Sequence, residues 1–326
     1  MKKTLLLINI ALMSMLSGCS TIGFVAFERL QPGDVSFPET ARQVGVINRI
    51  PLRTEQEREA EYASNSLMGD GKTACEALAQ GIAETGYFDQ VIICDSALWK
   101  KSEGADRSLP ATVTDSLLQS LGVDMLFSFE ELNIRLKENF MFVPEAGVTV
   151  PAIDGIVTPT VKVYVPNRRQ PLLGVSKADT LCWELTPELE YEQIIKEASE
   201  YAATLPIRHL LPHWSQQERC YYDGGNAEMR DAGIYIREQN WDAAAHLWQK
   251  VYDSKKGKAR MRAAFNLALY YEMQEDFDKA MTYLDEADRA AEEGSPDNRM
   301  ITFYRLQLAS QADKNRQLTI QMKRFE

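Results

Sequence analysis

The sequence has little of what metal sites and nucleic-acid-binding surfaces require. It contains three histidines and five cysteines in 326 residues, and no cysteine lies in a C-x-x-C or Cys/His spacing. A zinc cluster needs closely spaced ligands of these types, so we expect neither a bound metal nor a cofactor. The formal net charge is -11, which excludes nucleic acid as an expected partner because nucleic acid binds basic surfaces.

Long hydrophobic runs are missing after the first residues of the chain. Residues 5–16 are apolar, follow Lys2 and Lys3, and are too short to span a bilayer as a mature helix. This arrangement is typical of a secretory signal peptide. The next residues, Leu16-Ser17-Gly18-Cys19, resemble the bacterial lipobox, which implies cleavage before Cys19 and lipid on its thiol. The alternative is an ordinary signal peptide with a cysteine at its cleavage site.

The residues around Cys19 also predict a location. Ser20 replaces the aspartate of inner-membrane sorting signals, and no acidic run follows, so by analogy we expect the periplasmic face of the outer membrane. We assign residues 1–18 to the signal peptide and residues 19–43 to a lipidated tether with an extended lead-in.

Residues 44–188 have the pattern of an α/β domain with a mixed sheet. Apolar or alternating runs predict strands at residues 44–49, 91–94, 123–137, 161–165 and 181–185. Helical spacing predicts helices that end at Gly86 and Gly122. Within residues 123–137 the apolar positions change phase at Glu130-Glu131, which predicts a β-bulge.

The rest of the chain has helical spacing and an internal repeat. Residues 189–222 are predicted to be joining helices, and residues 223–326 to be all-α, so the fold class is α+β. The repeat has a period of 36 residues and resembles the tetratricopeptide repeat. The resemblance implies paired helices, with a degenerate third hairpin at residues 300–325 as a cap. Its matching positions are Ala232, Tyr235, Trp241, Ala244 and Trp248 in one copy and Ala268, Tyr271, Phe277, Ala280 and Leu284 in the other.

Several segments together resemble an uncharacterised lipoprotein family common in the Bacteroidota. They are Cys19, Val46-Ile47-Asn48-Arg49, Arg219-Cys220-Tyr221-Tyr222 and Trp241-Asp242-Ala243-Ala244. The resemblance implies a location and an architecture, and it implies no activity.

Three short motifs come close to known functional sites without completing them. Gly69-Asp70-Gly71-Lys72-Thr73 ends like a P-loop, but Ser66 stands where the first glycine is required. Gly174-Val175-Ser176-Lys177-Ala178 lacks the last glycine of a nucleophile elbow. His209 and His213 are four residues apart, but Pro212 interrupts the helix that would align them. We therefore predict a capped helix start, a loop and a packing contact.

The tetratricopeptide resemblance implies a partner-binding groove on the first helices of the repeats. Its residues are Met229, Ile236, Arg237, Arg262, Phe265, Leu269 and Glu272. They mix apolar and charged groups, as a docking groove requires. The alternative is an internal interface filled by the helix of residues 189–205.

These observations favour a non-enzymatic lipoprotein of the cell envelope that binds another envelope protein, either as an interaction scaffold or as an assembly or regulatory factor. An enzyme or small-ligand binder with its site in the α/β domain is the alternative, and a concave polar pocket would favour it. Two possibilities remain open for Cys75, Cys94, Cys182 and Cys220: one disulfide, or four buried thiols.

The variant Cys19→Ala tests the anchor. Each buried methylene of an acyl chain contributes about 0.8 kcal/mol to membrane binding, so loss of the chains should release the protein. We expect no incorporation of labelled fatty acid and no recovery in the membrane fraction. Uptake of labelled fatty acid by the variant would contradict the assignment.

Overall fold

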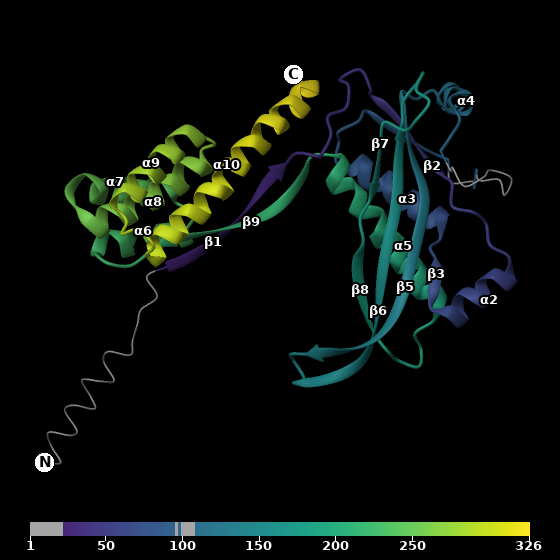
Figure 1. Cartoon of the computed structure of the whole chain (residues 1–326), viewed down its shortest axis with the longest axis horizontal. Coiled ribbons are helices and arrows are strands. Elements are labelled where there is room, and N and C mark those ends of the chain that lie inside the picture. Colours follow the sequence, from purple (N-terminus) through teal and green to yellow (C-terminus); the bar gives the residue numbers. More distant parts are fainter. Residues whose placement is uncertain (1–21, 95–96, 99–107) are drawn as a thin grey trace, which may run out of the picture. The chain divides into compact units, whose positions relative to one another are not determined.

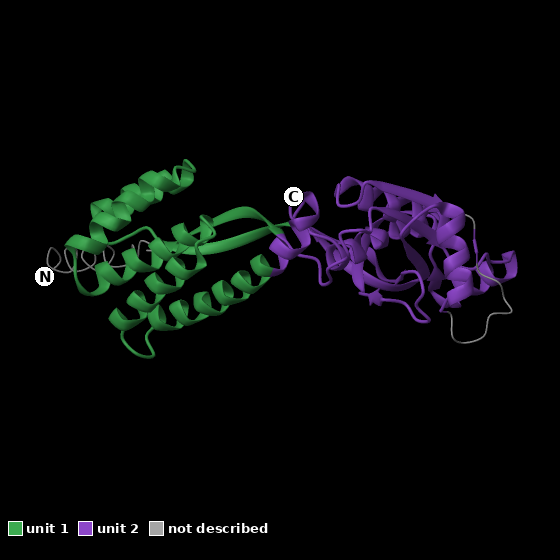
Figure 2. Cartoon of the chain, turned by 90° about the horizontal axis from the view of Figure 1, so that it is seen from above, with its two compact units in different colours: residues 1–30, 214–316 green, residues 31–213, 317–326 purple. Residues whose placement is uncertain are grey.

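The computed structural model describes residues 22–94, 97–98 and 108–326 and divides them into two compact units. Unit 1 consists of the chain up to Leu30 and Trp214–Arg316, and unit 2 of Gln31–His213 and Gln317–Glu326 (Figure 2). Unit 2 is thus inserted into the sequence of unit 1. The predicted signal peptide and Cys19 lie outside the described residues. The α+β fold class is confirmed.

Unit 2 is built on a mixed sheet of seven strands in the order β4-β2-β5-β6-β7, with β3 added beside β5 and β8 beside β6. β2 is parallel to β4 and β5, and the other pairs are antiparallel. The strands are β2 (Gln43–Asn48), β3 (Ser66–Met68), β4 (Gln90–Cys94), β5 (Met125–Val143), β6 (Val148–Tyr164), β7 (Leu173–Ser176) and β8 (Asp179–Glu184).

Helices cover both faces of this sheet (Figure 1). Side chains alternate between the faces of a strand, so Phe127 and Phe129 pack with α3 and α5 while Leu126 packs with Leu118 of α4. The predicted helices and strands are therefore confirmed, and they pack with one hydrophobic cluster on each face of the sheet. The helices are α2 (Glu55–Ser64), α3 (Gly71–Glu84), α4 (Ala111–Leu121) and α5 (Tyr191–Leu210).

The predicted bulge in β5 is confirmed, because the register with β6 shifts between Phe129 and Glu131. The extra residue, Glu130, is buried, lies 3.4 Å from the Arg49 guanidinium, and accepts a hydrogen bond of 3.1 Å from the Tyr164 hydroxyl. Burial raises the pKa of the Glu130 carboxyl, against the lowering effect of Arg49. Burial also raises the pKa of Tyr164 to about 12, helped by the charge of Glu130. The bulge thus places an ion pair inside unit 2.

The helical part of unit 1 consists of successive antiparallel helices around one core. The small residues at the predicted crossing positions, Ala232, Ala244, Ala268 and Ala280, are fully buried. The predicted third hairpin is wrong, because residues 296–322 form one continuous helix. The helices are α6 (Ala227–Arg237), α7 (Trp241–Ser254), α8 (Gly257–Met273), α9 (Phe277–Ala290) and α10 (Pro296–Met322).

Two strands complete unit 1 where the sequence predicted a tether and joining helices. β1 (Ile22–Gln31) and β9 (His213–Tyr222) form a two-stranded sheet. Residues 189–222 therefore do not form only helices: α5 belongs to unit 2, and β9 follows it. The burial of β9 alternates residue by residue, as a strand with one covered face requires.

The end of the chain belongs to unit 2 rather than to the helical unit predicted for residues 223–326. The Gln321 side-chain amide donates to the carbonyl oxygens of Gly33 and Val35, both at 2.8 Å, and its oxygen accepts from the Gly33 amide at 3.0 Å. The guanidinium of Arg324 lies 4.1 Å from the ring centre of Tyr87. These contacts hold residues 317–326 against unit 2, on Gly33, Val35 and Tyr87.

A buried carboxylate joins the strands and helices of unit 1. Glu272 of α8 is fully buried and accepts hydrogen bonds from Arg29 of β1 (3.0 Å), Arg219 of β9 (2.9 and 3.1 Å) and the Tyr304 hydroxyl of α10 (2.7 Å). Burial, followed by the charge of Glu272, raises the pKa of Tyr304 well above its usual value of 10. One side chain therefore connects four elements that are far apart in the sequence.

The variant Glu272→Ala should unfold unit 1 more easily. It leaves two buried guanidinium groups without their carboxylate, so we expect a loss of about 3 to 5 kcal/mol in the free energy of unfolding. Urea unfolding measures this loss of free energy, and hydrogen exchange of the α8 backbone amides shows whether it is located in unit 1. The exposed Glu293, between α9 and α10, provides the control: Glu293→Ala should change stability by about 0.5 kcal/mol or less. Equal effects of the two variants would contradict a structural role for the cluster.

Candidate functional site

A cavity of about 630 Å³ lies at the carboxyl end of β2, beside α2 and the start of α3. Ligands of α/β proteins bind at such strand ends, so this cavity is where the alternative of a small-ligand site would apply. Three basic side chains and one carboxylate line it. The lining residues are Asn48, Ile50, Pro51, Leu52, Arg53, Arg58, Gly69, Asp70, Gly71, Lys72 and Ala97.

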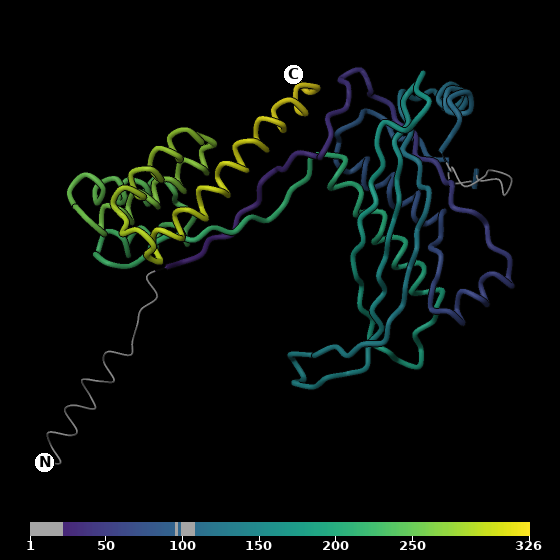
Figure 3. The backbone as a smooth tube through the Cα atoms, in the orientation of Figure 1, coloured from purple at the N-terminus to yellow at the C-terminus, as the bar shows by residue number. Residues whose placement is uncertain are grey.

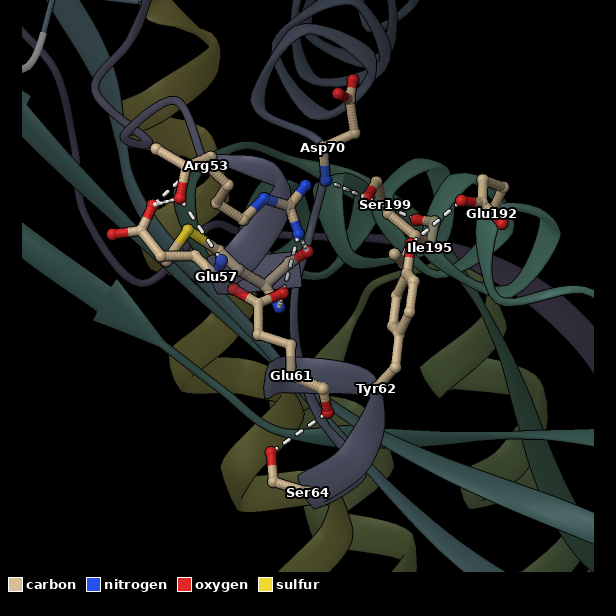
Figure 4. A network of polar contacts seen from close by, with 11 residues as sticks. Arg53, Glu57, Glu61, Tyr62, Ser64, Asp70, Glu192, Ile195 and Ser199 are labelled. Atoms are coloured by element: carbon tan, nitrogen blue, oxygen red, sulfur yellow. Dashed lines mark hydrogen bonds and ion pairs between the residues drawn. The ribbon is translucent and has the colours of Figure 1, made fainter. Parts of the chain in front are cut away.

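Arg53, the least exposed of the basic residues of this cavity, is bound within unit 2 (Figure 4). Its guanidinium lies 3.0 Å from the Glu61 carboxylate of α2 and donates to the carbonyl oxygen of Met68 in β3. Glu61 also accepts the Met68 amide at 3.1 Å. These bonds tie α2 to β3, so the charge of Arg53 serves the local structure.

The start of α3 is capped by its own chain. The Asp70 carboxylate accepts the Thr73 amide at 2.7 Å, which satisfies a helix-terminal amide that a phosphate would otherwise bind. The Asp70 amide donates to the Ser199 hydroxyl of α5 at 2.9 Å. A Cβ on Gly71 would lie 2.5 Å from the Asn48 side chain, so glycine lets the helix approach β2 closely. The P-loop-like sequence therefore forms a capped helix start, as predicted.

The serine and histidine motifs are also separated from one another. Ser176 ends β7, is followed by β8 rather than a helix, and accepts a hydrogen bond of 3.2 Å from the Thr160 hydroxyl. His209 lies 2.8 Å from the Asp34 carboxylate, whereas His213 lies 3.2 Å from the Leu211 carbonyl oxygen. Within the described ranges, no three histidine, cysteine, aspartate or glutamate residues form a group that could hold a metal ion.

Four of the five cysteines lie in the described part of the chain, and none of these four takes part in a disulfide. Cys75 is buried in the core of unit 2, Cys94 and Cys220 are half-buried, and Cys182 is exposed. Neither prediction from the sequence holds in full. The four cysteines form no disulfide, and one of them, rather than all four, is fully buried.

The predicted groove residues lie mostly inside unit 1. Met229, Ile236, Phe265, Leu269 and Glu272 are buried and leave no surface for a partner. The structure therefore contradicts a docking groove at these positions.

Neighbouring elements of unit 1 fill the face that the groove would have used. The Phe265 ring packs against Tyr222 of β9 and Tyr304 of α10, with ring centres 5.3 and 5.2 Å away. Arg262 donates to the Gly224 carbonyl oxygen at 3.3 Å, and Arg237 is exposed. The predicted alternative was right about an internal interface and wrong about the filler, because the helix of residues 189–205 belongs to unit 2.

The largest group of exposed apolar side chains in unit 2 lies on a hairpin arm, which we define as residues 139–151. Here β5 and β6 pair only with each other, through the register Phe140↔Pro151 to Val143↔Val148. Figure 3 shows the arm extending beyond the sheet and bending away from it. Phe140 is 71% exposed, Phe142 60% and Val148 50%.

The arm is short of charge and closed by a regular turn. Glu145 is its single charged residue, whereas 25% of the whole chain is charged. The amides of Ala146 and Gly147 donate to the Val143 carbonyl oxygen at 3.2 and 2.9 Å, and Gly147 has a φ of 65°. Glycine adopts this conformation without strain. The arm is thus an ordered element that presents apolar side chains to solvent.

The strand predicted from the sequence ended at Lys137, so the arm was not predicted. The signal was present: two runs of alternating or continuous apolar residues flank Pro144-Glu145-Ala146-Gly147, which is a hairpin pattern. A four-residue connection with glycine at its end predicts the turn that the structure contains.

Two family models of unknown function match parts of the chain. The model of the domain of unknown function DUF8603 matches residues 41–222, and that of the domain of unknown function DUF6340 matches residues 230–310. No curated protein matches the chain. No helix in the described ranges is both long and apolar enough to cross a bilayer.

Two solved structures show weak similarity. A dodecameric PelC variant from Paraburkholderia phytofirmans is 9% identical, covers 56% of this chain and 96% of its own, and has a TM-score of 0.27. A minor lipoprotein from Acinetobacter baumannii is 6% identical, covers 54% and 98%, and has a TM-score of 0.23. Both scores are too low to carry an argument.

The groups at the start of α3, where a phosphate would bind, predict that ATP does not bind in this cavity. Asp70 occupies the helix start with a negative charge, and the Thr73 amide is already bonded. We expect an unchanged melting temperature with ATP and Mg²⁺, and no stoichiometric zinc by elemental analysis. A rise in melting temperature with ATP that disappears in Lys72→Ala would contradict this prediction.

Proposed function

The chain belongs to the family of the domain of unknown function DUF8603, whose model matches more than half of it, and from its own residues we propose that it is a non-enzymatic docking protein of the bacterial cell envelope. The lipobox-like sequence at Cys19 supports lipid anchoring, at the periplasmic face of the outer membrane in this proposal. The partner is another envelope protein.

The single observation that carries the proposal is the hairpin arm. Isolated exposed apolar residues are common, but a projecting element with two exposed phenylalanines and one charge in residues 139–151 is a typical interaction site. Burying a phenylalanine side chain contributes about 1.5 to 3 kcal/mol relative to leaving it exposed. Phe140 and Phe142 are therefore the expected anchors of the partner.

The arm is a better candidate than either site considered from the sequence. The tetratricopeptide-like face is filled by β9 and α10. In the cavity beside α3, Arg53 already pairs with Glu61, and the Thr73 amide at the helix start is already bonded to Asp70. The arm is free to bind because its apolar side chains make no such contacts with the core of unit 2.

Site-directed photocrosslinking in living cells tests this function. Phe142 is replaced by the photoreactive analogue benzoylphenylalanine. The matched control is the same replacement at Phe303, which is 62% exposed on α10. We expect one discrete protein adduct from position 142 and none of the same mass from position 303.

A second pair of variants separates docking from folding. Phe140→Ser with Phe142→Ser should abolish the adduct from Val148→benzoylphenylalanine while changing the free energy of unfolding by about 0.5 kcal/mol or less, since both rings are exposed. An adduct that persists in this variant, or adducts of equal strength from positions 142 and 303, would contradict docking through the arm.

A further inference from the structure

The two edges of the hairpin arm differ in what they can bond. β3 covers the outer edge of β5 as far as Arg135, and the Leu136 amide donates to the Asn65 carbonyl oxygen at 2.9 Å. No described strand pairs with β5 on this side beyond that point. Because backbone groups alternate in direction along a strand, the amides and carbonyls of Glu138, Phe140 and Phe142 point outward from this edge. They form a row able to receive another strand.

The outer edge of β6 is blocked instead. β8 covers it from Val157 to Ala152, and the Leu185 amide donates to the Pro151 carbonyl oxygen at 2.9 Å. Pro151 follows at an outward position and has no amide hydrogen, so a strand could not pair regularly there. The β5 edge of the arm therefore offers the longer row of outward donors and acceptors.

Both faces of the arm are apolar beside that edge. Phe140 and Phe142 continue the face on which Ile134 and Leu136 are buried in the core. Met141 and Val143 lie on the opposite face, across from Val150 and Val148. A segment that adds to the edge would therefore cover apolar side chains with alternate residues on each of its two faces.

Two cations lie on one face at the base of this edge. Arg135 and Lys137 are exposed and form no ion pair with the described residues. The carboxylate of Asp154, which pairs with Lys137 in the register, accepts instead from the side-chain amide of Asn139 at 2.6 Å. The edge thus favours acidic groups at its base and apolar groups toward its tip.

A bilayer fits the arm less well than a polypeptide does. The outward amides and carbonyls of β5 would lose their hydrogen bonds to water in a hydrocarbon layer. The arm's single charge, Glu145, lies in the turn and would enter the membrane first. An added strand satisfies the same backbone groups and leaves Glu145 in water.

We propose that the partner binds by strand addition: an extended segment of another protein pairs antiparallel with β5 from Lys137 to Val143, beyond the part of the edge that β3 and Asn65 cover. Its apolar side chains lie beside Phe140 and Phe142, and acidic side chains near its carboxyl end face Lys137 and Arg135. Main-chain hydrogen bonds supply affinity, and the alternating side chains supply specificity. The inference rests on the proposed docking function and specifies its geometry.

A synthetic peptide, Thr-Val-Thr-Val-Thr-Val-Glu-Thr-Glu, tests the geometry with the full chain. In the antiparallel register its first residue lies opposite Val143 and its seventh residue, a glutamate, lies opposite Lys137. Its second and fourth residues, both valine, then lie opposite Phe142 and Phe140, and the final glutamate extends past the paired segment toward Arg135. Fluorescence anisotropy of the labelled peptide measures binding. We expect saturable binding that weakens at least about tenfold when alternate peptide nitrogens are methylated, because methylation removes the edge donors without changing a side chain.

Charge-reversal variants identify the edge. Arg135→Glu with Lys137→Glu should weaken binding about tenfold or more, whereas Lys177→Glu, an exposed lysine between β7 and β8, should leave it unchanged. Equal binding of the methylated and unmethylated peptides, or equal effects of the two charge changes, overturns strand addition.

The remaining outcomes separate this inference from the proposed function. If position 142 yields a protein adduct in cells but the peptide does not bind, strand addition is wrong and docking stands. An adduct between two copies of this chain, or binding to phosphatidylethanolamine and phosphatidylglycerol vesicles that is lost in Phe140→Ser with Phe142→Ser, overturns the inference in favour of self-association or a lipid surface.

Discussion

The pairing of β5 with β6 determines the form of unit 2 and of its proposed binding element. The two strands pair at seventeen positions, whereas β2 pairs with β5 at five. The long ladder serves two purposes along its length. Its first part is the centre of the sheet, covered by helices on both faces, and its last part extends past every neighbouring strand. An arm follows whenever a hairpin is longer than the sheet that contains it.

The bulge at Glu130 makes this arrangement possible. Before it, odd-numbered residues such as Phe127 and Phe129 face the core, and after it even-numbered residues such as Leu132 and Ile134 do. Without the extra residue, one of the two sets would face the wrong side. The same shift determines which side chains of the arm continue the core face, and it brings a carboxylate into the interior where Arg49 and Tyr164 bind it.

The sequence predicted local features and missed long-range ones. Periodicity located β2, α3, β4, α4 and the bulge, because each depends on side chains close together in the chain. It failed at β9, whose residues were assigned to helices, since its partner β1 lies almost two hundred residues earlier and no local pattern reveals it. It also treated Glu272 as a groove residue, because its partners Arg29 and Arg219 come from those strands. A position in a repeat predicts which way a side chain faces. Whether that face is covered depends on segments of the same chain that are distant in sequence.

The insertion of unit 2 into unit 1 has a consequence for the order of folding. Arg29 and Glu272 are separated by 243 positions in sequence, a long loop to close for a chain without structure. Unit 2 brings the two ends of its main segment together by itself, since the Asp34 amide donates to the His209 carbonyl oxygen at 2.6 Å. Once unit 2 has folded, the segments that become β1 and β9 leave it from neighbouring points, and the entropy of bringing them together has already been lost. We therefore expect the helical unit to form after the sheet unit, and a chain interrupted before α8 has no carboxylate at position 272 for the two arginines.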